Sequence, residues 1–252
     1  MFSLDGKVAL ITGGNGGIGL GMATGLAQAG ARVVIVGRNQ QKSDDAVAGL
    51  RAQGCRADAM TADVANEDSV QDLIGQVSLR CGRLDILINN AGINIRRPAH
   101  EMSLADWTSV LDTNLTSAFL CARAAYAPMK AAGGGKIINI GSMMSIFGAS
   151  FAPAYGASKG GIVQFTRSIA AAWAPDNIQA NAVLPGWIDT ELTKKARTDV
   201  DGLHDKVLAR TPAGRWGIPA DMAGIAVFLA SSASDFVTGT AIPVDGGYSS
   251  QG

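Results

Sequence analysis

Short apolar runs alternate along the chain with longer segments whose apolar residues recur at helical spacing. The short runs predict strands over residues 8–12, 32–36, 57–61, 84–88, 136–140, 178–183 and 241–244. The longer segments predict helices over residues 18–29, 40–52, 67–79, 104 to beyond 125, 155–173 and 219–230. Nearly continuous Val, Ile and Leu indicate strands buried on both faces, and the alternation indicates right-handed crossovers. We therefore expect one α/β domain over residues 1–252, a doubly wound Rossmann-type parallel sheet of about seven strands with helices on both faces.

The composition narrows the function classes. The 252 residues include 21 basic and 21 acidic side chains, and 47% are hydrophobic. This balance fits a globular protein and gives no electrostatic reason to expect nucleic acid or an anionic membrane as partner. Three dispersed Cys and two isolated His indicate neither a disulfide framework nor a metal site, and free thiols fit a reducing cytoplasm. We expect a cytoplasmic protein that binds a small molecule.

One segment, residues 8–31, carries no charge and is long enough to span a bilayer. It contains the glycine cluster Gly13–Gly17, which would break a helix in contact with lipid. No basic region and small-residue cleavage site flank it as in a signal peptide. We therefore expect no membrane association.

A glycine-rich turn follows the first predicted strand and leads directly into the first helix. Glycine lets the backbone approach a pyrophosphate closely, and the amide groups at a helix N-terminus attract that anion. A glycine-rich turn alone is weak evidence, but its position between strand and helix favours a phosphate site over an ordinary turn. The candidate cofactor residues are Gly13, Asn15, Gly16, Gly17, Ile18 and Gly19.

The ends of the next strands suggest which dinucleotide binds. Gly37 offers no acceptor to the ribose of NAD, whereas Arg38 can pair with the 2′-phosphate of NADP unless it is only a solvated surface charge. Asp63, followed by Val64, can accept from the adenine amino group or instead cap a helix. The small, polar residues Asn90, Ala91 and Gly92 follow the fourth strand, where the cofactor ribose should pass. We expect NADP(H) to be preferred, with NAD(H) possible.

Candidate catalytic residues follow the fifth strand. Ser142 stands at its end, and Tyr155 and Lys159 lie four residues apart, on one face of the next helix. The Lys159 ammonium and a positive nicotinamide ring should lower the pKa of Tyr155 from about 10, so that Tyr155 can exchange a proton during hydride transfer. Ser142 can hold the substrate oxygen, and Lys159 can also hold the nicotinamide ribose. Tyr and Lys at this spacing often occupy an ordinary helix surface, but their order after the glycine turn and Asn89–Gly92 favours catalysis.

These motifs together resemble the short-chain dehydrogenase/reductase family in its single-domain form, from about Gly6 to Gly247. The resemblance implies that Asn114 holds a water linking Lys159 to solvent. It also implies a homotetramer and a cofactor contact by the residues after the sixth strand, Pro185, Gly186, Ile188 and Thr190. One departure is Gly16, where members that prefer NADP often carry a basic residue.

Within that family, residues 134–142, 211–217 and 228–235 are most similar to gluconate 5-dehydrogenases and 2-deoxy-gluconate 3-dehydrogenases. This resemblance implies a sugar acid or related hydroxy-ketone as substrate. Other readings are a 3-oxoacyl carrier-protein reductase, which needs a basic patch beside the cleft, and a reductase of a neutral apolar ketone. A nucleotide-sensing regulator without turnover would be expected to lose Tyr155 or Lys159.

The substrate residues that we predict are Arg96, Ser142, Met144, Tyr155 and Trp187. Arg96 and Arg97 follow the fourth strand, where a guanidinium can bind a carboxylate. Because adjacent residues of an extended segment point in opposite directions, we expect only one Arg to face the cleft, although both can be surface charges. The apolar residues Met143, Met144, Phe147, Phe151 and Trp187 also flank the expected pocket, and they would suit an apolar ketone.

The segment over residues 190–210 is mostly polar and carries mixed charges. It lies between the sixth strand and the next helix, over the expected cleft, where mobile loops often close on substrate. We expect this lid segment to be the most disordered part of the unliganded protein. The alternative is a rigid surface helix.

Overall fold

The computed structural model describes residues 1–251, and its centre is a seven-stranded sheet in the order β3-β2-β1-β4-β5-β6-β7. All neighbouring strands are parallel. The strands are β1 (Val8–Thr12), β2 (Arg32–Gly37), β3 (Ala57–Thr61), β4 (Ile86–Asn89), β5 (Gly135–Ile140), β6 (Ile178–Pro185) and β7 (Ala241–Val244). The order reverses between β1 and β4, which is where such sheets open a crevice for a ligand. The predicted fold class is confirmed.

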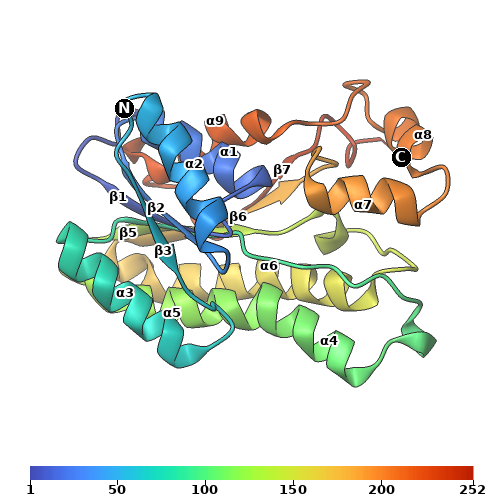
Figure 1. Ribbon diagram of the computed structural model, residues 1–252, viewed down its shortest axis with the longest axis horizontal. Helices are drawn as coiled ribbons and strands as arrows, with labels where there is room; N and C mark the ends of the chain where they lie inside the picture. The colour runs from blue at the N-terminus through green and yellow to red at the C-terminus, as the bar shows by residue number, and fades with distance from the viewer. Residues whose placement is uncertain (252) are drawn as a thin grey trace.

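Helices cover both faces of this sheet, with α1, α2 and α9 on one side and α3, α4, α5 and α6 on the other (Figure 1). The helices are α1 (Gly17–Gln28), α2 (Gln40–Ala52), α3 (Glu67–Cys81), α4 (Leu104–Leu111), α5 (Ser117–Ala131), α6 (Pro153–Trp173), α7 (Glu191–Asp199), α8 (Leu203–Arg210) and α9 (Ala223–Ala230). Short helical turns are η1 (Ala99–Glu101), η2 (Asp112–Thr116), η3 (Met143–Ser145), η4 (Ala174–Asp176), η5 (Pro219–Met222) and η6 (Ser232–Ser234). Within the described residues, no helix has both the length and the apolar character needed to cross a bilayer.

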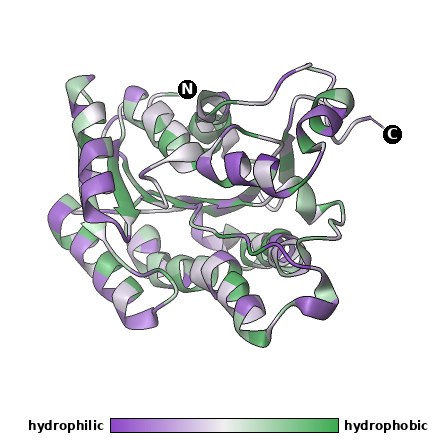
Figure 2. Cartoon of the chain, turned by 45° about the vertical axis from the view of Figure 1, so that its right-hand side comes forward, coloured by the Kyte–Doolittle hydropathy of each residue, from purple (hydrophilic) through white to green (hydrophobic). Residues whose placement is uncertain are grey.

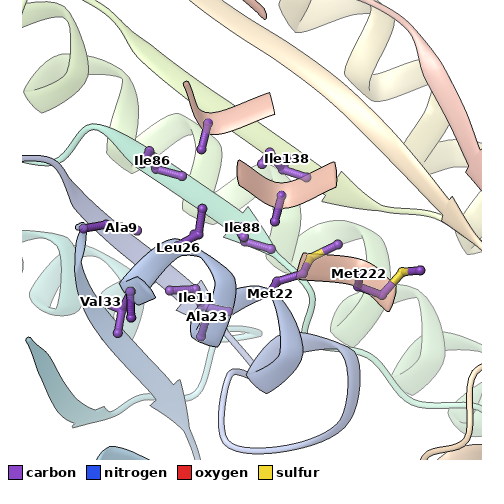
Figure 3. Close-up of a cluster of buried hydrophobic side chains, with 14 of the residues drawn as sticks. Ala9, Ile11, Met22, Ala23, Leu26, Val33, Ile86, Ile88, Ile138 and Met222 are labelled. Carbon is purple, nitrogen blue, oxygen red and sulfur yellow. The ribbon is translucent and has the colours of Figure 1, made fainter. Parts of the chain in front are cut away.

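The core consists of two apolar layers, one on each face of the sheet. Successive side chains of a strand point to opposite faces, so Ala9 and Ile11 of β1 pack with α1, while Val8 and Leu10 pack on the α3 and α5 side. Figure 3 shows the first layer, in which Leu26 of α1 lies over the strands. Hydrophobic residues follow the strands and the inner faces of the helices, as Figure 2 shows. This rigid sheet fixes the positions of the strand ends that form the site.

Three expectations about secondary structure need correction. The long helix expected after Ser103 is interrupted by the π-helical turn η2, so that it forms two helices, α4 and α5. The fourth strand begins at Ile86 rather than residue 84, and just before it the Asp85 carboxylate accepts from the amide of Val8 and from Arg83. The helix expected from Pro219 begins as the 3₁₀ turn η5.

The lid segment also has more regular structure than a disordered loop. It forms α7 and α8, which lie together at one side of the molecule (Figure 1). The two helices enclose a small apolar cluster of their own, made by Ala196, Leu203, Val207 and Trp216. This cluster is separate from the two core layers, so the lid segment packs as its own unit. Its mobility stays a prediction.

Candidate active site

A cleft of about 370 Å³ opens at the carboxyl ends of the strands. Its walls come from the turn after β1, the loop after β4, the end of β5, the start of α6, the end of β6 and α7. The predicted site residues that line it are Gly13, Asn15, Gly16, Gly17, Ile18, Asn90, Ala91, Gly92, Arg96, Ser142, Met144, Tyr155, Lys159, Pro185, Gly186, Trp187, Ile188 and Thr190. The fold therefore gathers into one cavity residues that are up to 177 positions apart, from Gly13 to Thr190.

The turn between β1 and α1 has the shape of an anion cradle. Gly13 has φ +61°, which favours glycine, and a Cβ there would lie 2.9 Å from the side-chain nitrogen Nδ2 of Asn90. Asn90 donates to the carbonyls of Thr12 and Gly13 and thereby ties the turn to the end of β4. A Cβ on Gly19 would clash with the carbonyl of Gly13, so α1 can approach the turn only with glycine at this position.

The N-terminus of α1 leaves its first amide groups free for a ligand. The N-cap residue Gly16 provides no side-chain hydrogen bond, and no acidic residue occupies the first turn. Unsatisfied amides and the positive end of the helix dipole attract a phosphate group. The cradle, defined here as residues 13–19, therefore fits the pyrophosphate of a dinucleotide.

Five predicted residues lie outside the cleft wall, and one of them, Asn114, is described below. Arg38 is exposed at the end of β2, and Asp63 is exposed after β3. The Asp63 carboxylate accepts from the amide of Ala65 and closes a local turn, while Asn66 is the residue that caps α3. Val64 is buried beneath this turn. The fourth, Gly19, belongs to the cradle but packs against Gly13 and Asn90 rather than lining the cavity.

Sequence reasoning missed Lys42, which reaches the cleft from the first turn of α2. Its Nζ lies 3.0 Å from the point that a Cβ on Gly16 would occupy. The lysine therefore places a positive charge beside the position where Gly16 lacks one. The sequence feature that could have located Lys42 is Asn39, a typical helix-capping residue three positions earlier. Its side chain accepts from the Lys42 amide, so that α2 begins at this point.

Ser142 is held at the end of β5 by a network that reaches α6. Its Oγ accepts from the amide of Met144 at 3.1 Å, and its own amide donates to Ser145 Oγ at 3.2 Å. Ser145 Oγ in turn donates to the carbonyl of Lys159 at 2.7 Å. The end of β5 is thus bonded to the helix that carries Tyr155 and Lys159.

Lys159 is buried next to Tyr155. Its Nζ donates to the carbonyl of Ile140 at 2.7 Å and lies 5.5 Å from the centre of the Tyr155 ring. Burial lowers the pKa of the Lys159 ammonium to about 8. The lysine can therefore lose or gain a proton near neutral pH.

In the protein chain alone the pKa of Tyr155 is raised, and the lowering expected with a bound nicotinamide stays a prediction. Burial raises this pKa, and a hydrogen bond with Ser142 and the positive charge of Arg96 offset only part of the rise. Removal from water penalises the phenolate more strongly than its neighbours stabilise it. Arg96, from the loop after β4, therefore acts electrostatically on Tyr155. The sequence alone assigns this residue to substrate binding only.

Asn114 lies in the π-helical turn η2 and is 2% exposed. Its Oδ1 accepts from the amide of Ile93, and its Nδ2 donates to the carbonyl of Ile93 and to Ser158 Oγ. A Cβ on Gly92 would lie 3.2 Å from Asn114 Oδ1 and 3.7 Å from Lys159 Nζ. The extra residue of the π turn thus directs Asn114 inward between the β4 loop and α6, as such turns often do at functional sites.

The two neighbouring arginines point in different directions. Arg96 lines the cleft and pairs with Asp199 of α7, whereas Arg97 pairs with Asp106 of α4 and has a 53% exposed side chain. Apolar Met143, Met144 and Phe151 form another part of the wall. Phe147 is outside it, because its ring packs against Tyr248 and Arg210. This part of the cleft therefore combines the Arg96 cation with an apolar wall.

The chain is similar to characterised oxidoreductases over nearly its whole length. A family model described as enoyl-(acyl carrier protein) reductase matches residues 13–249. The 2-dehydro-3-deoxy-D-gluconate 5-dehydrogenase of Escherichia coli K12 is 46% identical over 248 residues, which cover 98% of this chain and 97% of the relative. The chain belongs to the short-chain dehydrogenase/reductase family.

Two further members of this dehydrogenase/reductase family extend the comparison. The gluconate 5-dehydrogenase of Gluconobacter oxydans is 41% identical over 247 residues, with 98% of this chain and 96% of the relative covered. A crystal structure of gluconate 5-dehydrogenase from Burkholderia cenocepacia in complex with NADP and tartrate has a TM-score of 0.95 and 43% identity. It covers 100% of this chain and 98% of that chain. The chain whose structure is described here is therefore an NAD(P)-dependent oxidoreductase that acts on CH–OH groups.

Proposed function

We propose that this dehydrogenase/reductase interconverts a secondary hydroxyl and a ketone on a sugar acid, with NADP(H) as its preferred cofactor. The observation that carries this proposal is Arg96, whose side chain lies in the cleft, is 11% exposed and acts electrostatically on Tyr155. A largely buried guanidinium beside the proton donor suits a substrate whose carboxylate lies near the reacting carbon. The related gluconate-type enzymes, one of them solved with tartrate, support a hydroxylated acid.

The chain's own residues then move the proton and hold the reacting oxygen. When bound, the nicotinamide supplies or accepts the hydride. Ser142 Oγ donates a hydrogen bond to the substrate oxygen, and Tyr155 Oη gives a proton to that oxygen in reduction or takes it in oxidation. Lys159, buried at a pKa of about 8, passes the proton on, and Asn114 holds the water through which it reaches solvent.

The cradle would hold the pyrophosphate, and two basic residues would favour NADP over NAD. Arg38, exposed at the end of β2, and Lys42, beside Gly16, both present positive charge near the point where the adenosine ribose should lie. An additional phosphate gains charge-assisted hydrogen bonds from such side chains. Asn90–Gly92, Pro185, Gly186, Ile188 and Thr190 would line the remaining nicotinamide half.

A second candidate is the reduction of a neutral apolar ketone, which the wall formed by Met143, Met144 and Phe151 favours. A 3-oxoacyl carrier-protein substrate is less well supported. Its carrier is acidic, whereas α7 brings Glu191 into the cleft wall and Asp199 beside Arg96. Like charges at a docking site oppose association.

A substrate panel with NADP(H) and NAD(H) tests this proposal directly. Arg96→Ala should raise KM for gluconate-type acids about tenfold or more, as expected for a lost charge-assisted hydrogen bond, and should change KM for a neutral ketone little. The matched control is Arg97→Ala, because Arg97 has the same charge on the neighbouring residue but pairs with Asp106 outside the cleft. Turnover of neutral ketones only, or equal effects of both variants, would overturn the sugar-acid assignment.

We also propose that the enzyme works as a homotetramer in the cytoplasm. All three cysteines are free thiols, as a reducing compartment favours. Leu104 and Phe119 are exposed apolar residues on the consecutive helices α4 and α5, where subunits would meet. Light scattering coupled to size-exclusion chromatography should give four times the chain mass, and a monomer mass would contradict the assembly.

A further inference from the structure

An ion pair connects the loop after β4 to the lid segment across 103 positions of the sequence. Arg96 Nη1 donates to Asp199 Oδ2 at 3.1 Å, and Nη2 donates to the carbonyl of Leu192 at 3.1 Å. Leu192 and Asp199 stand near opposite ends of α7, so one guanidinium contacts both ends of this helix. The Arg96 side chain is 11% exposed and that of Asp199 33% exposed, so the pair is partly shielded from water.

The same guanidinium keeps hydrogen-bonding capacity for a ligand. It has five N–H donors in a fixed plane, of which the contacts to Asp199 and Leu192 use two. Its Nε is buried and has no partner among the described residues. A buried donor without an acceptor costs free energy that a suitable ligand restores. A carboxylate can take a remaining Nη hydrogen while Asp199 keeps its contact, and pairing with Nε as well requires the atoms that cover Nε to move aside.

The position of α7 is itself fixed by contacts that do not involve Arg96. Ala196 packs into the lid cluster with Trp216, and Arg197 pairs with Asp189 and lies 4.1 Å from the Trp216 ring centre. Asp199 therefore stands at the end of a helix that has its own supports. Its carboxylate is the charged contact that transmits this position to Arg96.

We propose that Asp199 is a positioning residue that holds Arg96 in the cleft. The binding of a substrate carboxylate by Arg96 and the place of the Arg96 charge beside Tyr155 then both depend on the docking of α7. The part concerning the substrate carboxylate rests on the proposed function. The part concerning Tyr155 does not. An arginine without this contact has many rotamers, and ordering it on substrate binding costs conformational entropy.

The charge effect has a definite sign. Tyr155 is surrounded by Ser142 at the end of β5, Lys159 on its own helix and Arg96 from the β4 loop. Lys42 and Glu191 are the other charged residues of the cleft wall. The Arg96 charge lowers the pKa of Tyr155, whereas Asp199 is not among the groups that shift it, so release of Arg96 raises that pKa. The rise of alcohol-oxidation rate with pH should then occur at higher pH.

The test compares Asp199→Asn, Asp199→Ala and Asp199→Glu in the full-length enzyme with NADP. Asp199→Ala should lower kcat/KM for gluconate about tenfold through KM, with a smaller loss for a neutral ketone, and should move the alkaline pH–rate limb upward. Asp199→Asn should lie between this variant and the parent, and Asp199→Glu should restore part of both effects. The control is Asp205→Asn, an exposed acid on α8, which should leave both quantities unchanged.

Two outcomes separate this proposal from the proposed function. If no sugar acid is turned over, the proposed function fails, and the pH–rate limb of Asp199→Ala with the ketone that is turned over still decides the positioning role. If sugar acids are good substrates but Asp199→Ala lowers all substrates equally without moving the pH–rate limb, Asp199 only stabilises the lid segment and the positioning role is wrong.

Discussion

The cradle and the lid segment border the same cleft, but they are built differently. The cradle consists of backbone from the end of β1 and the start of α1, fixed by contacts such as Asn90 to Gly13 and supported by the core layer beneath. The lid segment packs around its own small cluster and joins the rest through charged side chains, Arg96 with Asp199 and Arg197 with Asp189. Rigid backbone contacts of this kind suit the binding of a cofactor, which takes part in every turnover. Side-chain contacts on a separately packed unit suit the selection of one substrate over another.

The largest effect should come from Tyr155, which lines the same cleft as both regions. Tyr155→Phe keeps the ring and removes the proton donor, so kcat should fall about a thousandfold. Cofactor affinity should remain, because the cradle is unchanged. Steady-state kinetics and titration calorimetry measure the two quantities. Near-normal turnover by this variant would refute the proposed mechanism.

The cradle should tolerate no side chain at its closest backbone approach. Gly19→Ala places a Cβ against the Gly13 carbonyl and should cost roughly 1–3 kcal/mol in stability, with a marked loss of cofactor affinity. The matched control is Gly49→Ala in α2, where a Cβ meets nothing within 4 Å. Thermal unfolding and cofactor titration compare them. Equal behaviour of the two variants would show that the cradle is less constrained than its geometry indicates.

The rim of the cradle should set the choice between the two nicotinamide cofactors. Arg38→Ala and Lys42→Ala should each weaken NADP(H) binding about tenfold, as expected for a lost contact with a charged group, and should change NAD(H) binding little. The double variant should lose more than either single variant. Equal affinities of the parent protein for both cofactors, measured by calorimetry, would contradict the expected preference.

Loosening the lid segment should affect substrate and leave the cofactor alone. Trp216→Ala removes the largest side chain of the lid cluster, so amide exchange in residues 190–210 should accelerate and KM for the substrate should rise several-fold. In the parent, this segment should already exchange fastest among the described residues. Exchange there as slow as in β1 or β4 would exclude a mobile lid.

The smallest effect should be a pH dependence of folding stability caused by Lys159. Its pKa is about 8 in the folded chain and 10.5 in its ordinary state, so between these values the unfolded chain holds a proton that the folded chain has released. Stability of the protein without added cofactor should therefore rise as pH increases through this window. Lys159→Met should remove the rise. Denaturant unfolding at several pH values measures it, and identical profiles for parent and variant would argue against a depressed pKa.

Much of the molecule could be predicted because the information was local. Apolar runs such as Val8–Thr12 determined the strands, and the rule that ligands meet strand ends identified the turn after β1, Asn90, Ser142 and the helix carrying Tyr155 and Lys159. Helical spacing on one helix is a property of neighbouring residues, so it could be read from the sequence. Alternation in an extended loop likewise predicted that Arg96 and Arg97 would point in different directions.

Tertiary structure decided what depends on contacts between distant segments. Spacing could not show that Lys42 reaches Gly16, that a π turn directs Asn114 inward, or that Asp199 holds Arg96. It also could not show that burial raises the pKa of Tyr155, since removal from water depends on everything packed around the phenol. The sequence by itself determined the sheet, the order of the motifs and the reaction class. Which charges meet in the cleft was decided only when the chain folded, because Coulomb and desolvation energies depend on distance in space and not along the chain.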